Sequence, residues 1–423
     1  MEPLKRHLPN IVATFILTFA TVAIHGAGFD LPDQDAFAIG RGMAFVATAD
    51  NPSAIYFNPA GITQLKNNNL RVGLYGLDIE ESYKSPSGKT YHNENQFHAV
   101  PQFFYTYGMK DLPLSFGLGV YSPYGLSSHW PQDTGFRTVA TEGRVTYATI
   151  NPVVAWQITS NLSIAAGLTV NYCDMDLRQG LFWPTQPYDG FDFSGNGWTA
   201  GCNLGLLWKP FEKISFGASF RSPTTINLTG HTTAYNNVVV PYPPPYTIPA
   251  FSQRSAANAN FSFPLKTIVG VSYRPTPKWN LEFNADYTGW DTEGTVTVHQ
   301  STPAPVLPAN IPLVLNWQSS WYYEFGVTRS FDNGWHVSAG YIFNENSVPN
   351  AHYEPIVGDL DRHFLSIGTG FKGKRFDFDI AYQFGYGPTH TVSGSALSSA
   401  GQSADGQYDF ISHAIAISME WHF

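Results

Sequence analysis

The chain has 423 residues and a formal net charge of −9, and 15% of its residues are aromatic while only 13% are charged. Ordinary soluble domains carry roughly a quarter charged residues, so this balance argues against a soluble protein. A mean hydropathy of −0.16 is too polar for a helical membrane protein, and the negative net charge argues against nucleic acid as a partner.

The first residues have the order of a secretory signal peptide. Lys5 and Arg6 precede an apolar run at residues 11–24, and the small residues Gly26 and Ala27 follow it. The run is too short to span a bilayer stably, and no other apolar run in the sequence reaches that length. We therefore expect residues 1–26 to be a signal peptide and the mature protein to be exported.

Residues 27–68 show no alternation, whereas apolar and polar residues alternate in segment after segment from residue 69 to the end. This period of two predicts β-strands with one apolar face. The predicted strands lie near residues 69–83, 97–109, 114–124, 144–158, 162–178, 198–209, 214–228, 258–274, 280–298, 313–330, 335–347, 359–371, 375–388 and 408–423. We therefore predict an all-β transmembrane antiparallel up-and-down barrel of about fourteen strands, with both of its ends in the periplasm.

The connections between these strands alternate in length. Short turns are expected at residues 110–113, 159–161, 210–213, 275–278, 332–334 and 373–374, and long loops near 84–96, 125–143, 179–197, 229–257, 299–312, 348–358 and 389–407. Short turns at one end and long loops at the other are the layout of an outer-membrane β-barrel, with the long loops outside the cell.

The alternation also predicts which way side chains point. Phe376, Phe378 and Ile380 share one parity and Asp377 and Asp379 the other. Since a charge on the lipid face is costly, the apolar set should meet lipid and the charged set the lumen.

The same rule makes Arg221, Lys266 and Arg144 inward candidates, with Arg144 nearest the outer end. The two cysteines, Cys173 and Cys202, should point to opposite faces, which disfavours a disulfide bond between them.

The chain stops on an alternating strand, residues 411–423, whose last residue is Phe423. Such a terminal strand resembles the closing strand of bacterial outer-membrane barrels, which the barrel-assembly machinery reads as a signal. An ordinary strand of a soluble sandwich is the alternative. The first interpretation places the protein in the outer membrane, in contact with membrane lipid and lipopolysaccharide.

Motifs for catalysis are missing from the sequence, which contains no GxSxG elbow, no HExxH, no Walker loop and no CxxC. We therefore expect no enzymatic activity, no cofactor and no metal. The loop at residues 179–197 is instead apolar and includes Phe182 and Trp183. Exposed apolar surface of that kind favours capture of an apolar ligand, with contact to lipid headgroups as the alternative.

The segment before the barrel carries the functional signal. It contains AlaGlyPheAsp (27–30), GlyArgGly (40–42) and the triplet Asn58-Pro59-Ala60 followed by Gly61-Ile62. Together with residues 115–125, 219–223 and 285–290, these motifs resemble the long-chain fatty-acid transporter family, the FadL/TodX group. The resemblance spans the mature chain, and the family's fourteen-stranded barrel also guided the strand count given above.

The resemblance implies that residues 27–68 form an N-terminal hatch that plugs the barrel of residues 69–423. It implies passive uptake of hydrophobic molecules with sideways release through a kinked strand, by a protein that works as a monomer. Phe29 would then approach the ligand, and Asn58-Pro59-Ala60 would gate the path and sit against a kink in strand 114–124. A tight turn in a plug is the simpler explanation of the triplet.

Cargo identity stays open at this level. A fatty acid requires a cationic or hydrogen-bonding partner for its carboxylate, for which Arg221, Lys266 and Arg144 are candidates. Each of these residues could equally neutralise lumenal Asp or Glu. Aromatic hydrocarbons of the TodX type need no such partner, and a general porin or a lipid hydrolase are the remaining alternatives.

Overall fold

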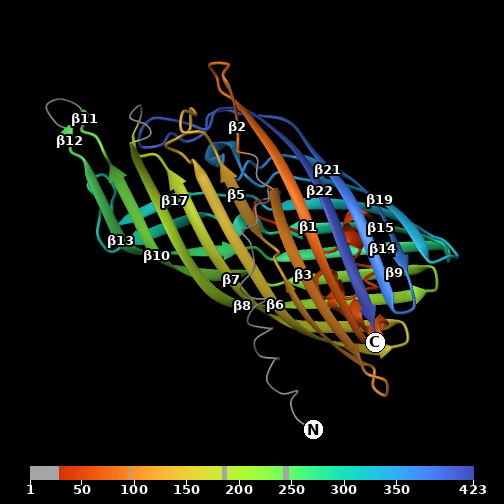
Figure 1. The fold of residues 1–423 in the computed structure, drawn as a ribbon. Coiled ribbons are helices and arrows are strands. Elements are labelled where there is room, and N and C mark those ends of the chain that lie inside the picture. The colour runs from red at the N-terminus through yellow and green to blue at the C-terminus, as the bar shows by residue number, and fades with distance from the viewer. Residues whose placement is uncertain (1–27, 95–96, 183–187, 242–246) are drawn as a thin grey trace, which may run out of the picture.

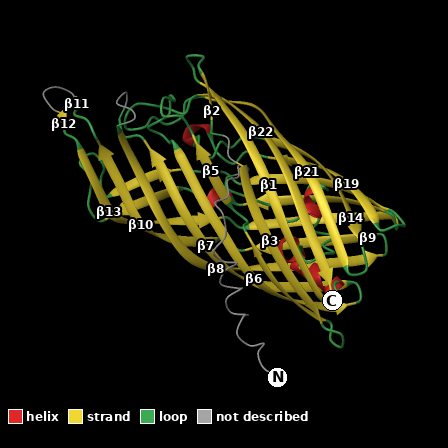
Figure 2. Ribbon diagram, in the orientation of Figure 1, coloured by secondary structure: helices red, strands yellow, loops and turns green. Residues whose placement is uncertain are grey.

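The computed structural model describes residues 28–94, 97–182, 188–241 and 247–423 as a closed antiparallel β-barrel that surrounds a short internal segment (Figures 1 and 2). The predicted signal peptide, residues 1–26, lies outside the described residues. Across the part of the chain that is described, no helix has the length and apolar character needed to cross a bilayer.

The wall contains 14 strands, as predicted, and closes where the first pairs with the last. Its segments are β1 (Asn67–Lys84), β3 (Phe97–Gly108), β4 (Leu114–Tyr121), β5 (Gly125–His129), β6 (Glu142–Thr159), β7 (Leu162–Gln179), β8 (Asp189–Phe211), β9 (Ile214–Arg221), β10 (Thr224–Asn236), β13 (Phe251–Phe263), β14 (Lys266–Thr276), β15 (Trp279–Thr288), β16 (Thr295–Gln300), β17 (Asn310–Val314), β18 (Ser320–Ser330), β19 (Trp335–Asn344), β20 (Arg362–Lys372), β21 (Phe376–Val392) and β22 (Gly406–His422). Short strands β2 (Thr90–His92), β11 (Val240–Pro241) and β12 (Thr247–Ile248) and short helices η2 (Trp290–Thr292) and η3 (Asn350–His352) lie in the connections.

Five wall strands consist of two segments each, namely β4/β5, β9/β10, β13/β14, β15/β16 and β17/β18. The strands predicted near 214–228, 258–274, 280–298 and 313–330 are therefore each present with an interruption that the alternation did not predict. Pro223 and Pro264 face each other in the ladder, because Arg221 pairs with Lys266 below them and Thr224 with Phe263 above. Neither proline has an N–H to donate, so hydrogen bonding between these strands stops at that level.

Aromatic belts mark the two membrane interfaces on the outer face of the wall. Ring pairs such as Tyr172–Trp198, with centroids 5.0 Å apart, form the upper belt, and pairs such as Phe376–Trp421, 5.6 Å apart, form the lower belt. Above the upper belt the outer face becomes polar. Asn227 of β10, for example, donates to Asn260 of β13 over 2.8 Å.

The predicted orientation of the two cysteines is confirmed. Cys173 is buried inside the wall, whereas Cys202 is partly exposed on the outside, and both are free thiols. A disulfide bond would require both side chains on one face of the sheet.

Residues 28–66, which we call the internal segment, lie inside the barrel and include α2 (Ala36–Ile39), α3 (Ala54–Phe57) and η1 (Pro59–Gln64) (Figure 2). Asp35 caps α2 by accepting from the backbone N–H groups of Phe37 and Ala38, and it also accepts from Arg71 of β1 over 3.1 Å. Arg71 donates in addition to Asp379, 2.7 Å away on β21. This buried network holds the start of the segment against the wall.

Glycines line the wall where the internal segment touches it. A Cβ atom on Gly217 of β9 would lie 2.0 Å from the Val46 carbonyl oxygen, and one on Gly340 of β19 would lie 2.0 Å from the Gly42 amide nitrogen. Gly205 of β8 has the same role beneath Asn58. Any side chain at these positions would collide with the backbone of the segment, so only glycine permits this close approach.

Candidate functional site

The third wall strand leaves a gap in the side of the barrel. β4 pairs with the lower half of β3, at residues 103–108, and with β6. Beyond the interruption at residues 122–124, β5 pairs only with β6 within the described ranges. The upper half of β3, residues 97–102, therefore has no wall strand on that side.

The start of the internal segment fills this gap. The Leu31 N–H donates to the Pro123 carbonyl oxygen over 2.8 Å, and the Gly125 N–H donates to the Phe29 carbonyl oxygen over 2.9 Å. From the other side, the Gln102 amide of β3 donates to the Asp33 carbonyl oxygen over 2.7 Å. The segment thus pairs by its backbone with the interruption of the third strand and is joined to β3 through the Gln102 side chain.

Phe29 ends this stretch in an aromatic cluster inside the barrel. Its ring centroid lies 5.5 Å from that of Phe261, 6.0 Å from that of Trp290 and 5.1 Å from that of Trp317. Trp290 and Trp317 both come from wall interruptions, where the backbone leaves the ladder and turns these side chains inward. The prediction placed Phe29 beside the ligand, and the structure places it beneath an apolar cavity.

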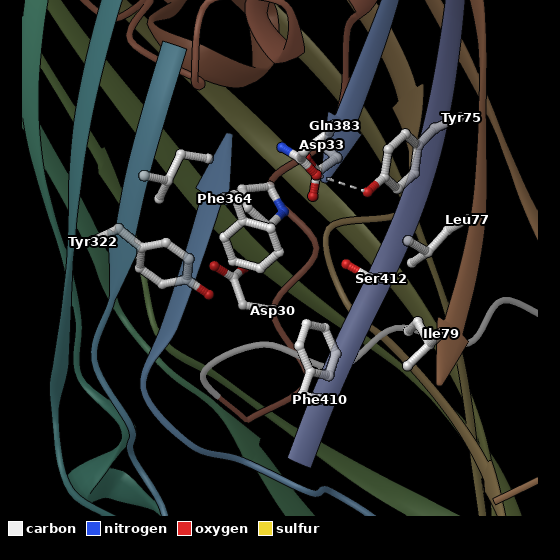
Figure 3. A pocket seen from close by; sticks show the side chains of 12 residues that line it. Asp30, Asp33, Tyr75, Leu77, Ile79, Tyr322, Phe364, Gln383, Phe410 and Ser412 are labelled. Carbon is white, nitrogen blue, oxygen red and sulfur yellow. Dashed lines mark hydrogen bonds between the residues drawn. The ribbon is translucent and has the colours of Figure 1, made fainter. Parts of the chain in front are cut away.

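That cavity has a volume of about 60 Å³ and lies between the cluster and the outer loops. Its lining includes Phe29, Met175, Phe191, Phe193, Leu315 and Ile356. A second cavity, of about 30 Å³, lies between the internal segment and the wall, with Asp30, Asp33, Leu77 and Phe410 among its lining residues. Figure 3 shows the carboxylate of Asp33 beside Gln383 and that of Asp30 beside Tyr322.

Lys266 is buried at the level of this second cavity and is already paired with carboxylates. Its ammonium group donates to Asp30 of the internal segment and lies 3.0 Å from Asp286 of β15. Two carboxylates around one buried cation leave it no free charge for a ligand. Lys266 was considered either as a partner for a fatty-acid carboxylate or as a cation that neutralises lumenal Asp or Glu. The structure shows the second arrangement.

Arg221 differs from its neighbour in the ladder. Within the described residues, no carboxylate lies within ion-pair distance of its guanidinium group, and its Nε has no hydrogen-bond partner. The group instead lies 4.4 Å above the ring of Tyr56 and donates to the Tyr56 carbonyl oxygen over 3.3 Å. The residue as a whole is partly buried, and the unpartnered Nε is fully buried.

Asp33 is a second unusual group in the internal segment. Burial raises the pKa of its carboxyl from 3.8 to about 7, although Gln383 donates to it over 3.2 Å. The nearby Asp30 carboxylate adds to this shift, whereas Lys266 opposes it. No motif in the sequence pointed to Asp33.

Arg144 does not face the lumen, so its prediction as an inward residue is wrong. It lies on the outer face of β6, partly exposed, where it pairs with Asp174 at 3.3 Å and with Asp176. The parity rule fails there because the outer face is polar above the upper aromatic belt, so a charge on it meets no hydrocarbon.

The triplet Asn58-Pro59-Ala60 is bonded to β8. The Asn58 amide donates to the carbonyl oxygens of Val46 over 2.7 Å and Leu206 over 2.9 Å, and its own oxygen caps η1 by accepting from the Ala60 N–H. Just before the triplet, the Tyr56 ring lies 5.2 Å from that of Tyr121 at the end of β4, whereas the backbone bonds to the interruption itself come from residues 29 and 31. The gating role of the triplet stays a prediction.

The apolar outer loop is only partly described. The Phe182 backbone N–H donates to Asp189 over 2.9 Å, and its carbonyl oxygen accepts from Arg137 over 3.0 Å. Its side chain is partly buried and packs against the core. Trp183 lies outside the described residues, so its predicted role in ligand capture stays a prediction.

Comparison with known proteins identifies the family. The family described as "Outer membrane protein transport protein (OMPP1/FadL/TodX)" matches residues 17–423. The long-chain fatty acid transport protein of Escherichia coli (strain K12) is 21% identical over 403 residues, which cover 85% of this chain and 88% of that protein. A putative outer membrane protein of Neisseria meningitidis serogroup B is 23% identical over 416 residues, with 86% and 87% covered.

Two solved structures share the fold. A Pseudomonas aeruginosa FadL homologue has a TM-score of 0.81 at 17% identity, covering 93% of this chain and 99% of that one. The Pseudomonas putida toluene transporter TodX has a TM-score of 0.70 at 15% identity, again covering 93% and 99%. The family match and the fourteen-stranded barrel agree, and the chain belongs to the OMPP1/FadL/TodX family of outer-membrane proteins that transport hydrophobic substrates.

Proposed function

We propose that this protein takes up long-chain fatty acids by passive diffusion through the barrel. The observation that carries the proposal is Arg221, a lumenal guanidinium group without a carboxylate partner among the described residues. A fatty-acid carboxylate would satisfy its free N–H groups by charge-assisted hydrogen bonds. The acyl chain would lie against the aromatic groups that surround Phe29.

The route follows the apolar surfaces. Cargo enters the cavity beneath the outer loops, passes the Phe29 cluster and leaves sideways between β3 and β5. Support for sideways release comes from the wall gap, where, among the described residues, the backbone of residues 29–31 pairs with the third strand and no wall strand pairs with residues 97–102 of β3. The fatty acid transport protein of Escherichia coli is a relative whose name states the same cargo.

Aromatic hydrocarbons are the second candidate cargo. The cluster of Phe29, Phe261, Trp290 and Trp317 offers ring faces and edges to an aromatic ligand without any charge. The toluene transporter TodX has the same fold. Arg221 favours the fatty acid, since a hydrocarbon would give its guanidinium group no anionic partner.

Uptake of oleate and of toluene by a strain that lacks its own transporter tests the proposal. We expect uptake of oleate, and we expect Arg221→Gln to lower it roughly tenfold, because a charged hydrogen bond contributes about 1.5–3 kcal/mol. Arg144→Gln is the matched control, since it removes an arginine from the outer face.

The outcomes separate the alternatives. The hydrocarbon would be favoured if the protein takes up toluene but not oleate, and if Arg221→Gln leaves toluene uptake unchanged. Large steady open channels in planar bilayers would favour a general porin, and hydrolysis of phospholipid by the purified protein would favour an enzyme. Uptake of neither compound would refute the proposal.

A further inference from the structure

A cavity of about 150 Å³ opens at the periplasmic end of the barrel, away from the path described above. It lies between the internal segment and the turn that joins β14 to β15. Its lining residues are Phe37, Arg41, Thr48, Asp50, Arg274, Pro277, Lys278, Trp279, Asn280, Thr328, Ser330, His336 and Lys372. Four of these side chains are cationic at every ordinary pH, and a single one, Asp50, is a carboxylate.

Arg41, from the Gly40-Arg41-Gly42 motif, forms the inner wall of this cavity. Its side chain is fully buried. Its Nη2 donates to Asn280 over 3.2 Å and lies 3.4 Å from the Glu282 carboxylate, but its Nε and Nη1 have no hydrogen-bond partner. Buried donors are almost always paired in native proteins, so two free ones on a cavity wall indicate an absent acceptor.

Arg274 supplies a second guanidinium group from the wall. Its only hydrogen bond from the side chain in the described residues is a long one, 3.4 Å, to the Ser215 hydroxyl, and no carboxylate lies within ion-pair distance. It is partly exposed at the end of β14. Arg41 and Arg274 thus both line the cavity with N–H groups that lack a hydrogen-bond partner among the described residues.

The two carboxylates near these guanidinium groups are shared with other partners, and the second oxygen of Asp50 is buried without a hydrogen-bond partner. Asp50 is bound by Lys372 at 3.5 Å, and Glu282 is occupied by the backbone N–H of Ala47 and by the Thr48 hydroxyl. Lys278 pairs with Asp332 at 2.7 Å, but that pair is exposed and contributes little. Burial alone would raise the pKa of Asp50, yet the cations Lys372, Arg274 and Arg41 hold it below its ordinary value.

The outer side of the cavity lies at the lower membrane interface. Trp279 is exposed on the outer face of the wall at the start of β15, and the Arg329 guanidinium lies 5.0 Å above its ring. Tryptophan at this depth sits at the level of lipid headgroups. The cavity therefore runs from the headgroup level of the inner leaflet to Arg41 inside the barrel.

We propose that this cavity binds a phosphate group, such as that of an anionic phospholipid headgroup, between Arg41 and Arg274. Guanidinium groups match the geometry of phosphate oxygens and bind them by paired hydrogen bonds. Pro277 and Trp279 provide the apolar contact that the glycerol end of a lipid requires. A bound headgroup would join the internal segment to the rim of the barrel, a role separate from cargo transport.

The test uses the full-length protein purified in a non-ionic detergent. Binding of inorganic phosphate is measured by calorimetry and binding of dihexanoyl phosphatidylglycerol by native mass spectrometry. Arg274→Gln is the main variant, because Arg274 is partly exposed and the barrel does not depend on it for an ion pair. Arg329→Gln is the matched control, since it removes an arginine at the same rim that does not line the cavity.

We expect the unmodified protein to bind phosphatidylglycerol, Arg274→Gln to weaken this binding at least tenfold, and Arg329→Gln to change it less than twofold. Binding of inorganic phosphate with the same dependence on Arg274 would identify the free ion as the source, and binding of the lipid alone would identify the headgroup. Arg41→Gln, accepted only with an unchanged melting temperature, should abolish binding of either ligand. Absence of binding to the unmodified protein, or equal losses in Arg274→Gln and Arg329→Gln, would overturn the proposal.

Discussion

Arg221 and Lys266 are directly opposite each other on neighbouring strands, and both face the lumen, but among the described residues only Lys266 has carboxylate partners. The difference arises from what lies in front of each residue. Asp30 and Asp286 converge on Lys266, whereas Arg221 faces the rings of Tyr56 and Tyr121. Two cations at equivalent positions therefore have different surroundings: Lys266 holds the internal segment by ion pairs, and Arg221 is the residue proposed to meet a ligand.

The ion pairs of Lys266 should be essential to stability. Lys266→Met leaves the buried carboxylates of Asp30 and Asp286 without a cation, and we expect a loss of about 3–5 kcal/mol in the free energy of unfolding. Urea unfolding in detergent micelles measures this loss. The triple variant Lys266→Met, Asp30→Asn, Asp286→Asn removes the unpaired charges and should recover most of it. Equal stability of Lys266→Met and the unmodified protein would contradict this assignment.

A methyl group on the wall should displace the internal segment. In Gly217→Ala the new Cβ would lie 2.0 Å from the Val46 carbonyl oxygen, so we expect the segment to shift and ion conductance to rise in planar-bilayer recordings. Gly294→Ala is the control, because the nearest atom to its Cβ would be 3.9 Å away. If the two variants have equally low ion conductance, contact with Gly217 does not hold the internal segment in place.

Asp33 should make the stability of the protein depend on pH. Its pKa is 3.8 when unfolded and about 7 in the folded protein, so the folded state binds more protons between these values. The free energy of unfolding should therefore fall as pH rises from about 4 to about 7, by up to about 4 kcal/mol, and level off above that range.

Asp33→Asn provides the check on this pH dependence. The variant should be more stable than the unmodified protein at pH 8 and nearly equal to it at pH 5, since the amide never ionises. Thermal unfolding at the two pH values distinguishes the cases. A stability difference that does not change with pH would show that Asp33 is not the titrating group.

The Asn58-Pro59-Ala60 triplet should fix the segment on β8. Asn58→Ala removes two hydrogen bonds to carbonyl oxygens and the cap of η1, so we expect the internal segment to lose about 1–3 kcal/mol of stability against local unfolding, measured by limited proteolysis of the segment in the assembled barrel.

We also predict that Pro59→Gly lowers oleate uptake without preventing assembly. Unchanged uptake in Pro59→Gly would remove the gating role of the triplet.

Alternation in the sequence predicted the barrel because every strand within the membrane must turn an apolar face to the lipid. It predicted that Lys266 and Arg221 face the lumen, since both lie below the upper aromatic belt. The same rule misplaced Arg144, because that residue lies above the upper belt. There the outer face of the wall meets polar surroundings, and a charge on it has no cost.

Interruptions of the wall were harder to predict than its strands. Pro223 and Pro264 were visible as prolines within predicted strands, but their alignment opposite each other depends on the register between two distant segments. Trp317 belongs to no motif in the sequence. Its contact with Phe29 follows from the interruption between β17 and β18, which the alternation of residues does not reveal. Asp30 belongs to the motif AlaGlyPheAsp (27–30), but its partner Lys266 lies 236 positions away in the chain and could not be predicted from it.

One stretch of backbone, residues 29–31, both closes the side of the barrel and presents Asp30 to Lys266 and Phe29 to the aromatic cluster. Withdrawal of this stretch would break the β-pairing at Pro123, the ion pair with Lys266 and the floor of the apolar cavity at the same time. On the proposed route, the same movement of residues 29–31 would therefore open both the passage past Phe29 and the sideways exit.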